Sequence, residues 1–194
     1  MKSEGFYLIL LGIVCIICLV IAGCCSTTET TTAPISDSNS NGITTTKAIS
    51  TKPTIVTTSM NRALVVKTYS GTFEITALDY KRGAEANQLM LAANMFNTKP
   101  DAGYEYLLIN VREKYASGDS SASVSKYEFQ VYANNVGHSA EFGVMPTSLK
   151  DFESVSLLSG GQVEGWIAFI VPEGANAKLS YEYLGEPKGF ITIP

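Results

Sequence analysis

The chain has 194 residues, a formal net charge of -4 and four cysteines, all at or before Cys25. Mild acidity without a basic stripe argues against nucleic-acid binding, which needs Lys and Arg side chains to neutralise phosphates. Beyond Cys25 there is no thiol for a disulfide, for nucleophilic catalysis or for a thiolate metal site, so packing and strand pairing must stabilise the remainder.

An uncharged apolar run extends from Phe6 to Ala22, behind a short polar start. Its length lies between the core of a signal peptide and a full membrane span, so length alone does not decide between the two. No Lys or Arg follows until Lys47. This charge distribution favours a location outside the cytoplasm for the rest of the chain.

The sequence Ile21-Ala22-Gly23-Cys24 resembles the lipobox of exported prokaryotic lipoproteins. By that resemblance residues 1–23 are a cleaved signal peptide, and the thiol of Cys24 carries the lipid that anchors the protein. The alternatives are an uncleaved signal anchor, in which the cysteines are small apolar residues of a retained helix, and full secretion. The expected location is the cell membrane, lipid-anchored or single-pass, with the remainder facing outwards.

Residues 24–60 are rich in Thr, Ser and Asn, with runs such as Thr44-Thr45-Thr46. Such a composition buries too little apolar surface to offset the entropy of ordering the chain. We therefore predict a disordered tether, which is also a plausible site of O-glycosylation.

From residue 61 the pattern changes to short apolar alternations separated by Gly, Pro and Asn. The expected strands span residues 63–68, 72–80, 104–115, 127–132, 162–171, 179–183 and 190–193. Seven or more short strands with almost no helical periodicity predict an all-β domain over residues 61–194, an immunoglobulin-like antiparallel β-sandwich.

Two details refine this prediction. Apolar residues change face after Ala77, which predicts a β-bulge or a strand that changes sheets. Between Lys81 and Gly103 the apolar residues around Leu89 suggest a short helix, but Asn94, Asn97 and Pro100 interrupt it, so the expectation is a long connection with local structure. A connection this long is often functional.

Three segments resemble the immunoglobulin-like, telokin-like domains of prokaryotic lipoproteins grouped as domain-of-unknown-function family 4352. They begin at Asn94-Met95-Phe96-Asn97, at Tyr127-Glu128-Phe129, and at Gly160-Gly161, which leads through Gly165-Trp166 to Val171-Pro172. The resemblance covers residues 64–194 and implies a β-sandwich outside the cytoplasmic membrane, without a known activity. Gly165 is expected to leave space for a neighbouring ring, that of Trp166 or a cross-strand Tyr.

No catalytic residue, metal ligand or cofactor is assigned. The single histidine, His138, is followed by Ser139, but neighbours in a strand point to opposite faces, so a catalytic triad is not expected. Tyr residues are abundant and could form a recognition surface for protein or sugar, although they also fit half-buried strands. The candidate ligand surface consists of Asn97, Tyr104, Tyr106 and Trp166.

The sequence therefore predicts a membrane-anchored, extracytoplasmic lipoprotein whose domain is a non-catalytic binding or adhesion module. Its expected partners are the membrane, through Cys24 or a retained helix, and a protein or glycan. A structural or accessory subunit of a cell-envelope complex is the main alternative, and a hydrolase is a weaker one.

Overall fold

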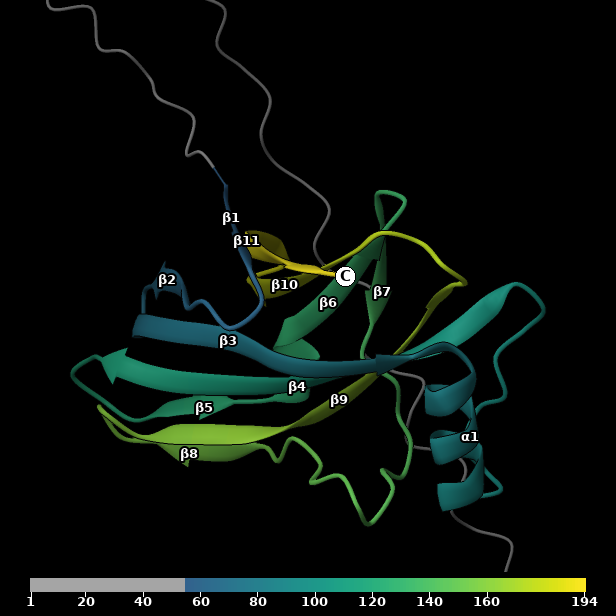
Figure 1. Ribbon diagram of the computed structural model, residues 1–194. Coiled ribbons are helices and arrows are strands. Elements are labelled where there is room, and N and C mark those ends of the chain that lie inside the picture. Colours follow the sequence, from purple (N-terminus) through teal and green to yellow (C-terminus); the bar gives the residue numbers. More distant parts are fainter. Residues whose placement is uncertain (1–54) are drawn as a thin grey trace, which may run out of the picture. The chain divides into compact units, whose positions relative to one another are not determined.

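The structure, a computed structural model, describes residues 55–194, and Figure 1 shows their arrangement. The elements in chain order are β1 (Val56–Ser59), β2 (Leu64–Thr68), β3 (Gly71–Arg82), α1 (Gly83–Ala93), β4 (Tyr104–Ser117), β5 (Ala122–Val124), the 3-10 helix η1 (Lys126–Glu128), β6 (Phe129–Ala133), β7 (Val136–Ser139), β8 (Val155–Leu157), β9 (Gln162–Pro172), β10 (Ala177–Tyr183) and β11 (Glu186–Ile193). The predicted signal segment 1–23, Cys24 and most of the predicted tether lie outside the described residues.

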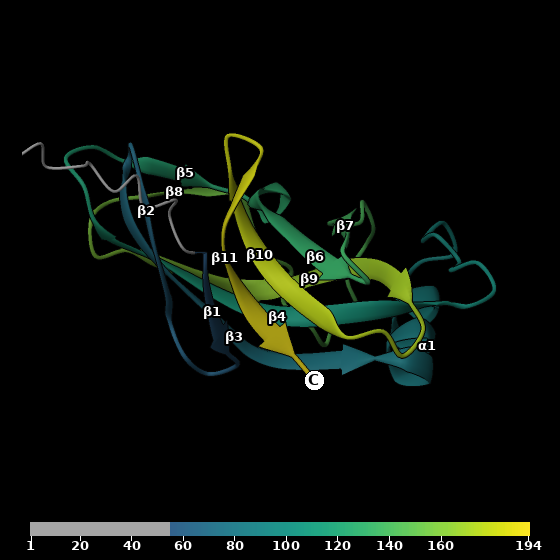
Figure 2. The same ribbon diagram turned by 90° about the horizontal axis from the view of Figure 1, so that it is seen from above.

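Two sheets enclose the core. One has the strand order β1-β11-β10-β6-β7 and the other β2-β3-β4-β9, while β5 and β8 form a separate pair. Strand β1 runs parallel to β11, and the other pairings are antiparallel. Figure 2 shows the strands of the first sheet crossing those of the second at an angle. The predicted immunoglobulin-like antiparallel sandwich is confirmed.

Strand β4 shows how the sequence pattern produces the core. Leu107, Ile109 and Val111 are fully buried between the sheets, as their alternation predicted. The intervening Tyr106 and Leu108 are also buried, because they pack with residues of α1 on the opposite face of the sheet. The strand is therefore covered on both sides where α1 lies against it.

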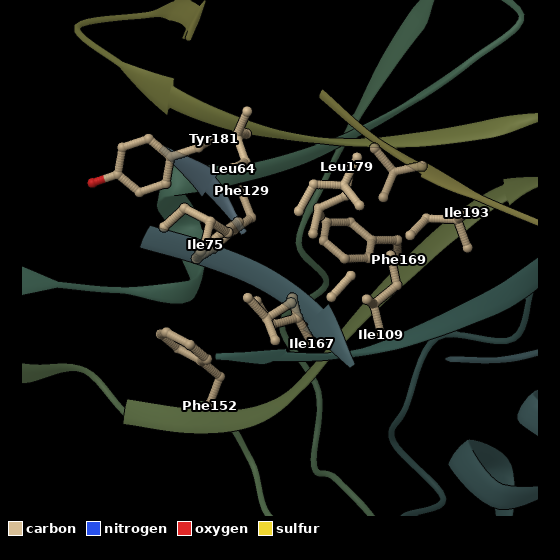
Figure 3. Packing of buried hydrophobic residues seen from close by; sticks show 14 of the residues in the cluster. Leu64, Ile75, Ile109, Phe129, Phe152, Ile167, Phe169, Leu179, Tyr181 and Ile193 are labelled. Carbon is tan, nitrogen blue, oxygen red and sulfur yellow. The ribbon is translucent and has the colours of Figure 1, made fainter. Parts of the chain in front are cut away.

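The main core joins side chains from both sheets, and Figure 3 shows Ile109, Phe169 and Leu179 packed against one another within it. The bulge expected after Ala77 is confirmed, since the register of β3 on β4 shifts between Ala77 and Asp79. The connection predicted between residues 81 and 103 contains a regular helix, α1, which ends at Ala93, directly before Asn94.

Three details of the prediction were wrong. Regular structure begins at Val56, inside the predicted tether, because a polar segment pairs through its backbone with β11. Tyr127 lies in η1, which the Ser125–Glu128 capping box stabilises, and β6 starts only at Phe129. Gly165 leaves space for the backbone of Phe152 rather than for a ring.

Among residues 55–194, no helix has the length and apolar character that crossing a membrane requires.

Candidate functional site

The four residues predicted to form a ligand surface do not share one exposed face. The Tyr104 side chain is 43% exposed, whereas Asn97, Tyr106 and Trp166 are buried. No observation tests their binding of a ligand, which stays a prediction. Instead, the three buried residues support loops at the α1 end of the sandwich. Cys24, the predicted lipid attachment site, lies outside the described residues.

Asn97 holds two distant loops together. Its Nδ2 donates to the carbonyl oxygens of Met90 at 2.7 Å and Val144 at 2.9 Å, and its Oδ1 accepts from the Val144 amide at 2.8 Å. A buried amide needs such partners, because each unsatisfied polar atom carries a desolvation cost. The end of α1 and the loop at residues 142–144 are thereby fixed side by side.

Tyr106 and Trp166 support the same region from the sheet. The Tyr106 hydroxyl donates to the Thr98 carbonyl oxygen at 2.6 Å, and burial together with the charge of Glu141 raises the pKa of Tyr106 to about 12. The Trp166 backbone binds the loop at residues 150–152, accepting from the Phe152 amide and donating to the Lys150 carbonyl oxygen. Both residues therefore position loops rather than contact solvent.

The loops joined by Asn97 carry large apolar side chains into solvent. Met95 is 85% exposed, Phe96 86% and Phe142 89%, and Val144 is also exposed. We call these four residues the apolar loop surface. A single exposed apolar residue is ordinary, but a group of them on adjoining, hydrogen-bonded loops is typical of an interaction site.

A cavity of about 350 Å³ is bordered by the continuation of the same loop after Asn97. It is lined by Thr98, Lys99, Pro100, Asp101, Tyr104, His138, Glu141 and Ile170. Tyr104 therefore lines this cavity together with His138, the single histidine.

His138 does not belong to an assembled catalytic relay. Its Nε2 is buried without a hydrogen-bond partner among residues 55–194. Asp101 and Glu141 line the same cavity, yet no side-chain hydrogen bond joins either one to His138 in this part of the chain, and no serine lines the cavity. Within the same residues, no three His, Cys, Asp or Glu side chains gather as metal ligands would. Among the residues that line this cavity, no nucleophile is paired with a base.

Half of the apolar loop surface lies in a segment that the sequence had indicated as functional. The loop between residues 81 and 103 was singled out, and it carries Met95 and Phe96. Phe142 and Val144 were missed because residues 140–154 form neither a helix nor regular strands. The sequence does contain an indication of these residues. Phe142 and Val144 flank a glycine in a stretch that lacks the alternation of a strand, and such a stretch gives no buried face to its apolar side chains.

The sandwich and its loop-borne surface define the class, an immunoglobulin-like β-sandwich without an evident catalytic centre in the described residues. The family model described as "Domain of unknown function (DUF4352)" matches residues 67–189. The chain therefore belongs to this family, as its sequence motifs predicted. No curated protein matches the chain.

Solved structures share the fold at low sequence identity. A candidate lipoprotein of Bacillus subtilis, ycdA, matches with a TM-score of 0.50 and 18% identity over 68% of this chain. That match spans only 38% of the Bacillus protein. The secreted protein MPT63 of Mycobacterium tuberculosis matches with a TM-score of 0.55 and 11% identity, covering 73% of this chain and 100% of MPT63. These similarities establish the fold alone.

Proposed function

We propose that the protein is a non-catalytic binding module, held at the outer side of the cell membrane, that recognises a protein partner through the apolar loop surface. The observation that carries this proposal is the exposure of Phe96 and Phe142 on loops fixed by the buried Asn97. Because the backbone of these loops is already ordered, binding through their aromatic side chains requires little further ordering of the loops, and aromatic residues commonly anchor protein interfaces.

The chemistry of the surface favours a protein over a glycan or a lipid. Met and Phe are enriched in protein interfaces, whereas the side chains of this surface offer a sugar no strong hydrogen-bond donor or acceptor. Glu141 directly precedes Phe142, and Asp101 lies along the other loop. Lys99 is balanced by these carboxylates, so this end lacks the cluster of Lys and Arg with which proteins bind anionic headgroups.

Membrane attachment rests on the lipobox. Cys24 follows Ile21-Ala22-Gly23, and the Thr- and Ser-rich stretch behind it would give the domain reach. The candidate lipoprotein and the secreted protein of the same fold are compatible with an extracytoplasmic location. The intact mass of the membrane form provides the test: a lipid added to a chain that starts at Cys24 supports the proposal, and an unmodified full-length chain contradicts the lipid anchor.

Affinity capture from solubilised cell envelopes tests the binding surface. The full chain should retain one specific partner that the Phe96→Ser/Phe142→Ser variant loses. The matched control is Tyr69→Ser/Leu158→Ser, which removes two other large exposed apolar side chains. Loss of the partner with the control variant, or its retention by the loop variant, would contradict the assignment. Co-purification as one stoichiometric complex, unaffected by either variant, would instead favour an accessory subunit.

A further inference from the structure

A second and larger cavity lies at the opposite end of the sandwich from α1. Its volume is about 630 Å³, and it is enclosed by the β2–β3 turn, the β4–β5 connection, η1 and β10. In Figures 1 and 2 the first two of these segments lie far from the helix. The cavity is therefore separate from the apolar loop surface.

The lining of this cavity has an unusual balance of side chains. Tyr69, Phe73 and Tyr181 contribute aromatic rings, and Asp119 and Glu128 contribute carboxylates. No Lys or Arg is among the lining residues. Several serine hydroxyls complete the wall. Aromatic rings combined with carboxylates, without a competing cation, form a favourable environment for positive charge.

Behind Tyr181, which lines the cavity, Glu113 provides a buried carboxyl group. Its side chain on β4 is 0% exposed, and neither carboxyl oxygen has a hydrogen-bond partner among the described residues. Its cross-strand neighbours, Ile75 on β3 and Val163 on β9, are apolar. Figure 3 shows the hydroxyl of Tyr181 pointing away from the apolar core residues around it.

The groups that act on Glu113 are all neutral or acidic. Burial, and to a lesser extent the charge of Glu128, raise the pKa of Glu113 to about 8, although the nearby Tyr181 hydroxyl acts in the opposite direction. Burial also raises the pKa of Glu128, and burial with the Glu113 charge raises the pKa of Tyr181. None of the salt bridges within residues 55–194 involves Glu113 or Glu128.

A buried carboxylate without a cation beside it is costly, and protonation or a bound cation relieves that cost more fully than the single hydroxyl of Tyr181 does. A proton suffices while the cavity is empty. A cation seated against Tyr181 and Glu128 would allow Glu113 to ionise, so a proton would leave as the cation enters. Lys188 lies over the ring of Tyr183, with its Nζ 6.0 Å from the ring centroid, and pairs with Glu186 at 2.9 Å, so Tyr183 is not counted among the rings that contact a ligand.

We infer that this end cavity binds a small organic ammonium ion, with the aromatic rings of Tyr69, Phe73 and Tyr181 and the carboxylate of Glu128 contacting it and Glu113 providing buried negative charge. The site does not depend on the apolar loop surface. Either proposal can fail while the other holds.

Calorimetric titration of the full chain with choline tests the inference, and 3,3-dimethylbutan-1-ol is the control because it has the same shape without the charge. Choline should bind at least about tenfold more tightly than the alcohol, a difference of the size that cation–π and carboxylate contacts supply. Equal binding of the two compounds, or no binding of choline at millimolar concentrations, would overturn the assignment without reliance on any variant.

Variants then locate the site. Glu128→Gln, which retains an acceptor for the Ser125 amide, should weaken choline binding about tenfold, whereas Glu173→Gln at an exposed position should not. Repeating the titration at pH 7 in buffers of different ionisation enthalpy should show proton release that disappears in Glu113→Gln. Unchanged affinity in Glu128→Gln, or identical proton release in Glu113→Gln, would contradict the proposed site.

Discussion

Glu113 is the residue whose ionisation should dominate the pH dependence of stability. Its pKa is about 8 in the folded protein against an ordinary value of 4.5, because burial favours the neutral carboxyl. Between these two values the native state binds more protons than the unfolded state. The stabilisation is therefore fully present below pH 4.5 and is lost as pH rises towards 8.

Urea unfolding from pH 5 to 9 provides the measurement. The wild-type protein should lose up to about 5 kcal/mol of unfolding free energy over this range from Glu113, whereas Glu113→Gln, a neutral substitute, should lack this contribution. Identical pH profiles for the two proteins would show that Glu113 does not carry a raised pKa.

Asn97 is the second residue with a specific structural consequence. Asn97→Ala removes three hydrogen bonds to Met90 and Val144 and leaves buried backbone groups without partners. We expect a loss of about 2–3 kcal/mol in unfolding free energy. In Asn94→Ala, which removes one exposed hydrogen bond to the Phe96 amide, the loss should stay below about 1 kcal/mol. A loss in Asn97→Ala no larger than that of the control would contradict the role of Asn97 as the link between the loops.

At the scale of elements, strands with strong alternation were predictable and those without it were not. The alternation of Leu107, Ile109 and Val111 predicted the buried face of β4. The change of face after Ala77 predicted the bulge. Strand β1 escaped prediction because its partner β11 is distant in sequence and its own side chains are polar. The pairing of β5 with β8 was not predictable either, because three residues are too few to show an alternation.

The candidate site was predictable only in part for a similar reason. The alternation in β4 continues through Val111 to Glu113 and Tyr115, so the buried position of Glu113 could have been read from it. Its neighbour Tyr181 comes from the opposite sheet, and no sequence pattern indicates that contact. The joining of the loops that carry Phe96 and Phe142 depends on the hydrogen bonds of Asn97 to Val144, which the sequence does not indicate either.

Gly165 tests the packing of β9 against the loop that follows β7. A Cβ at this position would lie 2.5 Å from the Asp151 carbonyl oxygen and from the Phe152 Cα, both backbone atoms that cannot rotate away. Gly165→Ala should therefore cost about 3 kcal/mol or more in unfolding free energy.

Gly174→Ala is the control, because its Cβ would meet nothing within 4 Å and only its φ of 67° opposes substitution. That strain should cost about 1 kcal/mol. Equal melting temperatures for the two variants would contradict the close approach of the Asp151–Phe152 backbone to β9.

At the scale of the whole molecule, the described domain places two different surfaces at opposite ends of one sandwich. The end near α1 presents apolar side chains to solvent, and the far end presents an acidic, aromatic cavity. The packed core lies between them, so we expect substitutions at one end to leave the other end unchanged. We expect the apolar end to define the principal partner.

Site-specific photo-crosslinking in the cells that produce the protein tests this central claim most directly. A photoreactive phenylalanine at position 96 or at position 142 should give an adduct with the same partner protein. The same probe at Tyr69, which is 99% exposed at the other end, should not form that adduct. Adducts to lipid alone at positions 96 and 142, or the same protein adduct at all three positions, would contradict it.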